Sequence, residues 1–347
     1  MGVATGFAQG PEANTDVVRR AVELAMQGVS SDIANSVLLF LTSAFQLSPA
    51  LLRTASRVAN CTQVMGCVAP GIFTETNSAI HVPAAAAMVL TGQLALQHQQ
   101  GEAGLRLALA SADALSTDWQ DSDASRLGGL TAPTMPVWRH GRVVEQGYTE
   151  AAIHGASGHV GLAHGLSRRG EFRPVTAVQG HELVFLGGKP ALQTLQQACG
   201  LDVPLNRVAA CVAEDEAAAA QGRVNYLPVL GAQEESRSVT LAQPLAAGQW
   251  VCWAVREDAE MLGDAESMMR DLKSAMPEAD FGLFFCCLGR SPMLDIGSER
   301  DWQLLRKVFP GLPVIGFHGM GEIAPISAAS RLLQHSAVLG LFEEWKR

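Results

Sequence analysis

The chain has 347 residues, which at roughly 100 to 200 residues per domain predicts about two domains. Apolar residues make up 48% of the chain and charged residues only 17%, a composition that excludes a disordered protein. The formal net charge is −9 and no lysine or arginine cluster is present, so the sequence offers no electrostatic footprint for nucleic acid.

The sequence predicts a cytoplasmic protein. No basic residue precedes an apolar run at its start, so we expect no secretory signal. Two long uncharged stretches, residues 33–52 and 76–101, contain prolines and polar residues, which favours buried strands and turns over membrane insertion. The seven cysteines include no C-x-x-C motif, and their odd number indicates reduced thiols in a reducing compartment.

An internal repeat organises the predicted elements. Near the start, a strand is expected over residues 37–45, a helix over 51–59 and a second strand from Val64. Near the end, the same order of strand, helix and strand recurs over residues 282–317. This order is typical of a β-α-β unit, so the sequence predicts an α/β fold of two pseudo-repeated halves, with mixed β-sheets flanked by helices.

The middle of the chain carries shorter signals. Residues 117–136 are rich in Asp, Ser, Gly and Pro, which predicts an exposed connection, either a linker or a loop of the first domain. Residues 175–186 predict a hairpin, and a helix is expected over 190–199, with proline in its first turn and glycine after its end. A methionine-rich helix over 258–276 has apolar residues three and four apart, which favours a buried face over a partner-binding surface.

Three segments stand out as possible family motifs. The first is the Gly66-Cys67 loop, which ends in Gly71-Ile72-Phe73-Thr74-Glu75. The other two are Cys287-Leu288-Gly289-Arg290, and Pro313-Val314-Ile315-Gly316-Phe317 with Gly321-Glu322-Ile323-Ala324-Pro325. Together they resemble the FIST family, whose paired FIST-N and FIST-C modules occur in bacterial signal-transduction proteins and in a eukaryotic F-box protein. The first segment resembles the N-terminal module and the other two resemble the C-terminal module. Ala324 departs from the family pattern, where a glycine is commoner. The resemblance implies a FIST-N-like domain over residues 1–186 and a FIST-C-like domain over 187–347.

The resemblance also implies a function. It points to a cytoplasmic sensory protein that binds a small ligand and acts through a separate signalling partner, because the two modules leave no residues for an output domain. Two alternatives remain open: a haem-binding nitric oxide sensor, and a protein-interaction adaptor without catalysis. The cofactor is therefore unknown, with haem as one option, and neither nucleic-acid binding nor membrane insertion is expected.

The candidate ligand-binding residues follow buried strands. In open α/β sheets, ligands bind beyond the carboxyl ends of the strands, where glycine loops let backbone N–H groups approach. Two such loops are expected, over residues 66–71 and 316–321, although their glycines could equally serve tight turns. The expected ligand-binding residues are Gly66, Cys67, Gly71, Arg290, Gly316, His318, Gly321 and Glu322.

Four of these residues have side chains with alternative roles. Arg290 could bind a ligand carboxylate through both guanidinium nitrogens or hold Glu322 in place, and Glu322 could bind a ligand amine or cap a helix. His318 is the candidate iron ligand if haem binds, and otherwise a structural histidine; no other metal site is expected. Cys67 could be a nucleophile, but a buried structural thiol is favoured. No Walker loop, G-x-S-x-G or H-E-x-x-H motif is present, so we expect no catalytic residues and no enzyme.

Overall fold

The computed structural model describes residues 2–98, 104–114, 124–290, 300–326 and 329–346. The chain divides into two compact units: the first unit is Met1–Ala163 with Ala265–Arg347, and the second unit is His164–Asp264. The boundary expected between residues 186 and 187 therefore falls inside the second unit. The division into FIST-N-like and FIST-C-like domains is a division of the sequence and stays a prediction.

The first unit contains a sheet, called sheet A, that is built around the first predicted β-α-β unit. β2 and β3 are parallel neighbours joined through α2 (Pro49–Val58), and the other neighbours in the sheet are antiparallel. In spatial order its strands are β1 (Val3–Gln9), β6 (Ala84–Leu90), β2 (Ser36–Thr42), β3 (Val64–Ala69), β10 (Val137–Arg139) and β11 (Arg142–Val143).

Sheet B is built in the same way around the second predicted β-α-β unit. β21 and β22 are parallel neighbours, and α6 (Arg300–Val308) lies between them in the chain. Its strands in spatial order are β13 (Ala156–Ala163), β25 (Ala337–Glu344), β21 (Phe281–Cys287), β22 (Val314–Gly319), β4 (Gly71–Thr74) and β5 (Ser78–Ile80). Both β-α-β units are thus confirmed, and the protein is an α/β protein with mixed sheets.

Sheet C has the same strand arrangement as sheets A and B, a parallel pair flanked by antiparallel strands. The sequence did not predict this third sheet. In spatial order its strands are β7 (Ala95–Gln97), β12 (Tyr148–His154), β8 (Arg106–Ser111), β9 (Arg126–Thr131), β23 (Gly321–Ile326) and β24 (Ala329–Leu333). β8 and β9 are its parallel pair. The exposed connection expected over residues 117–136 is wrong for β9, which is buried throughout. Residues 117–123 of that connection lie outside the described residues.

The three sheets interlock through exchanged hairpins. The β4–β5 hairpin follows β3 of sheet A in the chain, but β4 pairs with β22 of sheet B. In the same way, β10 follows β9 of sheet C and pairs with β3 of sheet A. β23 follows β22 of sheet B and pairs with β9 of sheet C. Each sheet is therefore completed by a hairpin that follows, in the chain, the parallel strand pair of another sheet.

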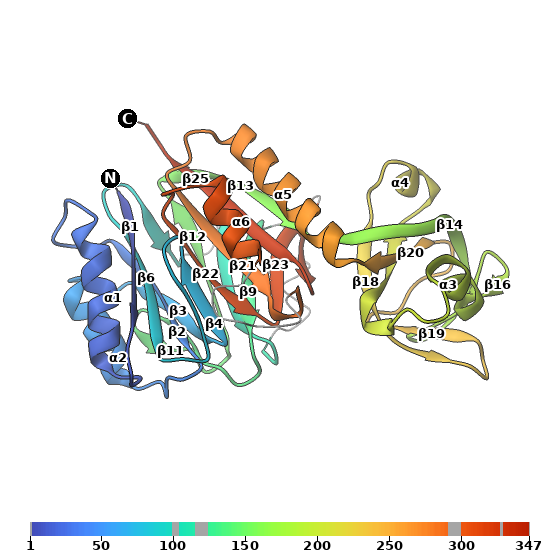
Figure 1. Cartoon of the computed structure of the whole chain (residues 1–347), viewed down its shortest axis with the longest axis horizontal. Helices are drawn as coiled ribbons and strands as arrows, with labels where there is room; N and C mark the ends of the chain where they lie inside the picture. The colour runs from blue at the N-terminus through green and yellow to red at the C-terminus, as the bar shows by residue number, and fades with distance from the viewer. Residues whose placement is uncertain (1, 99–103, 115–123, 291–299, 327–328, 347) are drawn as a thin grey trace. The chain divides into compact units, whose positions relative to one another are not determined.

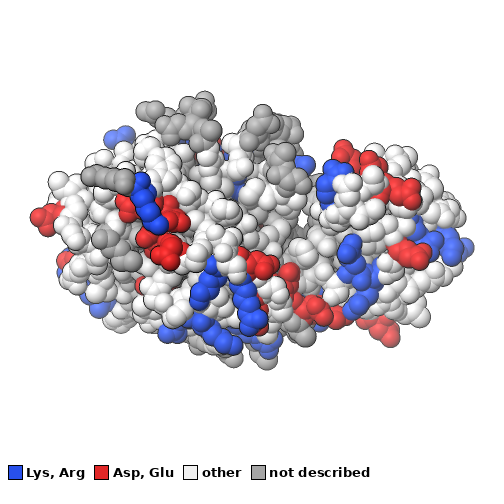
Figure 2. Space-filling view, turned by 90° about the horizontal axis from the view of Figure 1, so that it is seen from above, with Lys and Arg blue, Asp and Glu red and all other residues white. Residues whose placement is uncertain are grey.

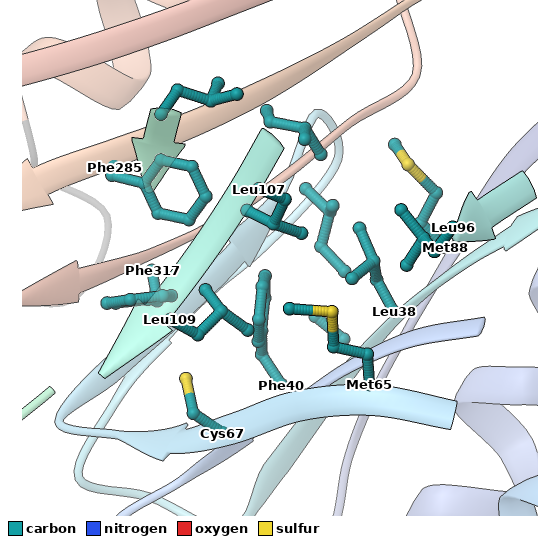
Figure 3. Close-up of a cluster of buried hydrophobic side chains, with 14 of the residues drawn as sticks. Leu38, Phe40, Met65, Cys67, Met88, Leu96, Leu107, Leu109, Phe285 and Phe317 are labelled. Atoms are coloured by element: carbon teal, nitrogen blue, oxygen red, sulfur yellow. The ribbon is translucent and has the colours of Figure 1, made fainter. Parts of the chain in front are cut away.

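The inner faces of the three sheets share one hydrophobic core (Figure 3). The Phe317 ring lies in this core, with its centroid 5.2 Å from that of Phe40 and 5.1 Å from that of Phe285. The outer face of sheet A packs against α1 (Thr15–Gln27) and α2, and that of sheet B against α5 (Asp258–Ala275) and α6 (Figure 1). The buried methionine face predicted for the helix over 258–276 is confirmed by α5.

The second unit is a closed antiparallel barrel (Figure 1). The order is β14 (Leu166–Gln179), β20 (Trp250–Arg256), β17 (Val208–Ala213), β18 (Asn225–Gln233), β19 (Ser238–Leu241) and β15 (Glu182–Leu186). The β14–β15 pairing closes the barrel, which confirms the predicted hairpin, and β16 (Lys189–Pro190) extends it at β15. The predicted helix over 190–199 is confirmed by α3 (Ala191–Cys199), and shorter helical segments are α4 (Glu216–Ala220), η2 (Leu205–Arg207) and, in the first unit, η3 (Leu288–Arg290).

Three further observations concern the helices, the cysteines and the charged surface. Among the helices of the described residues, none combines the length and apolar composition needed to cross a bilayer. All seven cysteines are free thiols. Figure 2 shows several basic side chains gathered at the lower middle of the visible face, with acidic side chains beside them and elsewhere on that face.

Candidate functional site

A buried polar cluster lies where the parallel strands β21 and β22 end. Arg290 follows β21 through η3, and Glu322 is the second residue of β23, directly after β22. The segment before β25 links the two side chains, because Arg290 Nη1 donates to the His335 carbonyl (3.5 Å) while Ser336 hydrogen-bonds Glu322. The structure thus places Arg290 and Glu322 in one cluster, which was one of the two alternatives considered for Arg290.

Arg290 binds a carboxylate of the chain itself. Its Nε donates to Asp301 Oδ2 (2.7 Å) and its Nη2 to Asp301 Oδ1 (2.9 Å), a paired geometry that fixes the guanidinium plane. The Arg290 side chain is 3% exposed and that of Asp301 is 12% exposed. Burial opposes the charge of Arg290, but Asp301 outweighs this effect and raises its pKa. The pair of hydrogen bonds that Arg290 was expected to make to a ligand carboxylate is therefore made to Asp301, in the first turn of α6.

Glu322 is fully buried and has one oxygen without a partner. Its Oε2 accepts hydrogen bonds from Ser336 N (3.3 Å) and Ser336 Oγ (2.5 Å). Within the described residues, its Oε1 has no hydrogen-bond partner. Burial raises the pKa of Glu322 to about 8, against the opposing effect of the Ser336 hydrogen bonds, so the carboxyl is mainly protonated at neutral pH. A neutral carboxyl with a free oxygen offers one donor or acceptor to a polar partner.

Gly66 and Gly316 lie within strands β3 and β22, so the expectation that they belong to loops is wrong. A Cβ on Gly66 would lie 1.8 Å from the Leu39 carbonyl oxygen, and a Cβ on Gly316 would lie 1.8 Å from that of Phe284. These glycines are therefore required by the close approach of the paired strand. Their contact with a ligand remains a hypothesis.

Gly71 and Gly321 open strands β4 and β23, the first strands of two exchanged hairpins. Gly71 pairs with His318, and a Cβ on Gly71 would lie 3.0 Å from His318 Cδ2. A Cβ on Gly321 would lie 2.8 Å from the Leu333 carbonyl oxygen. Both glycines thus permit tight strand pairing beside the candidate site.

Cys67 points into the shared core between the sheets (Figure 3). Its side chain is fully buried, and burial raises the pKa of the thiol well above its ordinary value. A thiol in this environment stays protonated and is a poor nucleophile. The geometry supports the structural interpretation of Cys67.

His318 does not fit the role of a haem ligand. It lies within β22, is 5% exposed, and its ring centroid is 5.0 Å from that of Phe73. The ring also lies against Gly71, so two of its neighbours are protein residues. An axial haem ligand needs an open face toward the macrocycle, and a side chain that is 5% exposed offers little of one.

Sequence reasoning missed Asp301 and Ser336, the partners of Arg290 and Glu322. Neither lies in a recognisable motif: Asp301 is one acidic residue of a helix first turn, and Ser336 precedes β25. A second buried ion cluster was also missed. Glu150 binds Arg106 Nε (3.0 Å) and Arg126 Nε (2.7 Å), and accepts a hydrogen bond from Tyr148 Oη (2.6 Å). The Glu150 carboxylate is thus shared by two buried guanidinium groups of the chain itself, an arrangement typical of a structural cluster.

The fold and the site define an α/β protein with three interlocked sheets and a β-barrel inserted in the chain, carrying a buried polar cluster at the ends of parallel strands. Comparison with known protein families adds a closer assignment for part of this chain. Residues 189–325 match the model of the FIST C domain, which confirms the resemblance over this part of the chain. The FIST C domain belongs to a family of sensory domains of signal transduction.

Similar chains occur in mycobacteria. An uncharacterized protein of Mycobacterium bovis and one of Mycobacterium tuberculosis are each 25% identical to this chain over 224 residues. Another uncharacterized protein of Mycobacterium tuberculosis is 24% identical over 224 residues. These alignments cover 62% of this chain and 58% of each relative.

Proposed function

We propose that this protein is a cytoplasmic sensory protein that binds a small polar ligand and acts through a separate signalling partner. The FIST C domain supports the sensory role. The observation that carries the ligand proposal is the unpaired Oε1 of the fully buried Glu322.

An unsatisfied buried oxygen costs on the order of 1–3 kcal/mol, and a ligand that supplies the missing hydrogen bond recovers this free energy on binding. Because the carboxyl is mainly neutral, it suits an uncharged polar group better than the ligand amine considered from the sequence. Arg290 is a positioning residue in this proposal, since Asp301 holds its guanidinium beside the segment that contains Ser336.

The location supports the same proposal. The parallel strands β21 and β22 both end at this cluster, and ligands of α/β proteins bind beyond such carboxyl ends. A ligand bound there would contact β23, which follows β22 of sheet B and pairs with strands of sheet C. Binding would therefore alter the connection between sheets B and C. Such a change offers a route by which a signalling partner could sense the ligand.

Native mass spectrometry of the full chain, purified gently from its own host, tests the proposal. We expect a retained small mass in the wild type and its loss in Glu322→Met, which keeps most of the volume but removes the polar atoms. Glu182→Met is the matched control, because Glu182 also accepts hydrogen bonds from two side chains, Ser238 and Thr240, but lies in the second unit. A wild type without any retained mass, or equal retention in Glu322→Met, would contradict the proposal.

A further inference from the structure

Two cysteines of the second unit lie directly opposite each other on neighbouring strands. In the antiparallel ladder of β17 and β20, Cys211 is the partner of Cys252. The chain neighbours of both cysteines belong to the hydrophobic core of the barrel, so the two thiols lie on the opposite, outer face. Side chains of directly opposite residues contact each other across a sheet, and these two thiols share a hydrogen bond. The fold therefore brings the two sulfur atoms together.

The backbone around this pair suits a disulfide. Opposite residues of an antiparallel pair have Cα atoms about 4.5–5.5 Å apart, and disulfides span Cα distances of about 4.4–6.8 Å. A bond between the Sγ atoms of Cys211 and Cys252 therefore needs no large movement of the strands. Cys286 and Cys287 are the contrasting case, because consecutive residues of a strand point to opposite faces of the sheet.

The two thiols differ in acidity, which gives them different roles. The hydrogen bond from the Cys211 thiol, with a further contribution from the charge of Arg168, holds the pKa of Cys252 below its ordinary value. The same hydrogen bond, together with burial, raises the pKa of Cys211. Cys252 is therefore the thiol that loses its proton first, and the thiolate is the nucleophilic form.

Tyr226 extends the pair by one position across the sheet. Tyr226 on β18 is the cross-strand partner of Cys211, and its hydroxyl donates a hydrogen bond to the Cys211 sulfur. The Tyr226 ring lies against the His164 ring, with 4.4 Å between the centroids, and the His164 backbone N–H donates to Asp264 Oδ2 (2.8 Å). These contacts hold a hydroxyl donor beside the sulfur that keeps its proton longer.

A single layer of side chains separates the thiols from solvent. Cys211 is 0% exposed and Cys252 is 1% exposed, but the apolar side chains packed against them are only partly buried: Leu166, Phe172, Val224 and Tyr226. Partly exposed side chains change rotamer rapidly, so a small uncharged oxidant reaches Cys252 without opening of the barrel. No surface for a larger ligand is needed, because the new bond joins two atoms of the chain itself.

We propose that Cys211 and Cys252 form an oxidative modification site, at which a hydroperoxide converts the two thiols reversibly into a disulfide. In the first step the Cys252 thiolate attacks a hydroperoxide oxygen: an S–O bond forms, the O–O bond breaks, and the leaving hydroxide or alkoxide takes up the proton that Cys252 released. In the second step the Cys211 sulfur attacks the Cys252 sulfur. The S–S bond forms, the S–O bond breaks, and the oxygen leaves as water with the Cys211 proton.

The reaction balances without a further reactant. The two thiols lose two electrons and two protons, and the hydroperoxide is reduced to water and an alcohol, or to water alone when it is hydrogen peroxide. A thiol reductant reverses the change by thiol–disulfide exchange. The site is separate from the Glu322 cluster and does not depend on the function proposed there.

Peptide mass mapping of the native full chain after treatment with hydrogen peroxide tests this site. The treated protein is unfolded in iodoacetamide, which blocks the remaining thiols, and is digested without reductant. We expect a linked pair of peptides that contain Cys211 and Cys252, and its disappearance when dithiothreitol is added before unfolding. Native wild type that yields no such pair, or that links other cysteines instead, would overturn the proposal.

Variants of the thiols separate the two steps. Cys211→Ala should stop the reaction at the sulfenic acid of Cys252, which dimedone traps when the variant is unfolded, and Cys252→Ala should leave Cys211 reduced. Cys199→Ala is the matched control: Cys199 is a partly buried free thiol of the same unit, and its loss should leave the rate of disulfide formation unchanged. Alanine keeps these sites small and apolar, and circular dichroism checks that each variant is folded. Sulfenic acid on Cys211 in place of Cys252 would overturn the assigned roles.

Tyr226→Phe tests the hydroxyl donor in the native fold. Phenylalanine keeps the ring that packs against His164 but removes the hydrogen bond to the Cys211 sulfur. Disulfide formation should therefore slow by about twofold to tenfold, the equivalent of one neutral hydrogen bond, while the first step at Cys252 proceeds at its wild-type rate. A wild-type rate of disulfide formation in Tyr226→Phe would overturn the role given to Tyr226.

Discussion

Gly129 leaves the space that the Phe317 ring occupies: a Cβ on Gly129 would lie 2.7 Å from Phe317 Cζ. The two residues lie in corresponding strands, β9 of sheet C and β22 of sheet B, each directly after the glycine that approaches its parallel partner strand. The corresponding residue of sheet A is Cys67. The three corresponding positions therefore fill the shared core unequally: Phe317 supplies a large side chain, Cys67 a medium one and Gly129 none.

Gly129→Ala should destabilise the first unit by about 1–3 kcal/mol, because an added methyl group overpacks a filled core. Urea denaturation measures the change. Gly263→Ala is the control: Gly263 lies in α5, where an added Cβ would meet nothing within 4 Å, and its replacement should stabilise the helix by about 0.5–1 kcal/mol. Equal stability of Gly129→Ala and the wild type would show that Phe317 does not fill this space.

The same relationship explains why the third copy of the sheet plan was not predicted. The two β-α-β units were recognisable because each combines an apolar run with a helix of amphipathic period. In β9, Gly128 and Gly129 stand within a Gly-, Asp- and Pro-rich stretch and indicated a loop. Both glycines are in fact required by packing, since a Cβ on Gly128 would lie 1.7 Å from the Ala108 carbonyl oxygen. Close backbone approach and loop formation favour the same residue type, so composition alone does not separate them.

The candidate site was predictable only in part. Arg290 and Glu322 were found because they follow buried strands, and their proximity was one of the expected alternatives. Which carboxylate Arg290 would bind depended on the placement of α6, a tertiary relationship that no local pattern encodes. The burial of Glu322, which leaves its carboxyl mainly neutral, likewise depends on the strands packed around it.

The stability of the protein should fall between about pH 5 and pH 8 through Glu322. Its pKa is raised to about 8 in the folded protein, so the folded state keeps a proton that the unfolded state releases above its lower, ordinary pKa. Stability from this group is complete at acidic pH and declines as the pH rises toward 8. Urea midpoints of the wild type and Glu322→Gln, measured across this range, should diverge; curves that stay parallel would exclude the raised pKa.

Asp301→Asn should cost about 3–5 kcal/mol, because it leaves the buried Arg290 guanidinium without its counter-charge. Thermal or urea unfolding of the variant provides the measurement. The exposed pair of Arg270 and Glu266 gives the comparison, since Glu266→Gln should change stability by less than about 1 kcal/mol. A small effect of Asp301→Asn, similar to that of Glu266→Gln, would mean that solvent reaches Arg290.

Cys67 should resist alkylation in the folded protein. Burial raises the pKa of both Cys67 and Cys199, but the Cys67 thiol is fully buried whereas Cys199 is partly exposed at the end of α3, so accessibility separates them. Iodoacetamide labelling followed by peptide mass mapping should therefore modify Cys199 well before Cys67. Labelling of Cys67 at the rate of Cys199, without unfolding, would revive a nucleophilic role for it.

The neutral, incompletely hydrogen-bonded carboxyl of Glu322 is the central claim about the candidate site, and infrared difference spectroscopy tests it most directly. At neutral pH, the spectrum of the wild type minus that of Glu322→Gln should contain the C=O stretch of a protonated carboxyl, and this band should disappear as the pH is raised through about 8. A difference spectrum with only carboxylate bands at neutral pH would show that Glu322 is ionised, and the account of the site would be wrong.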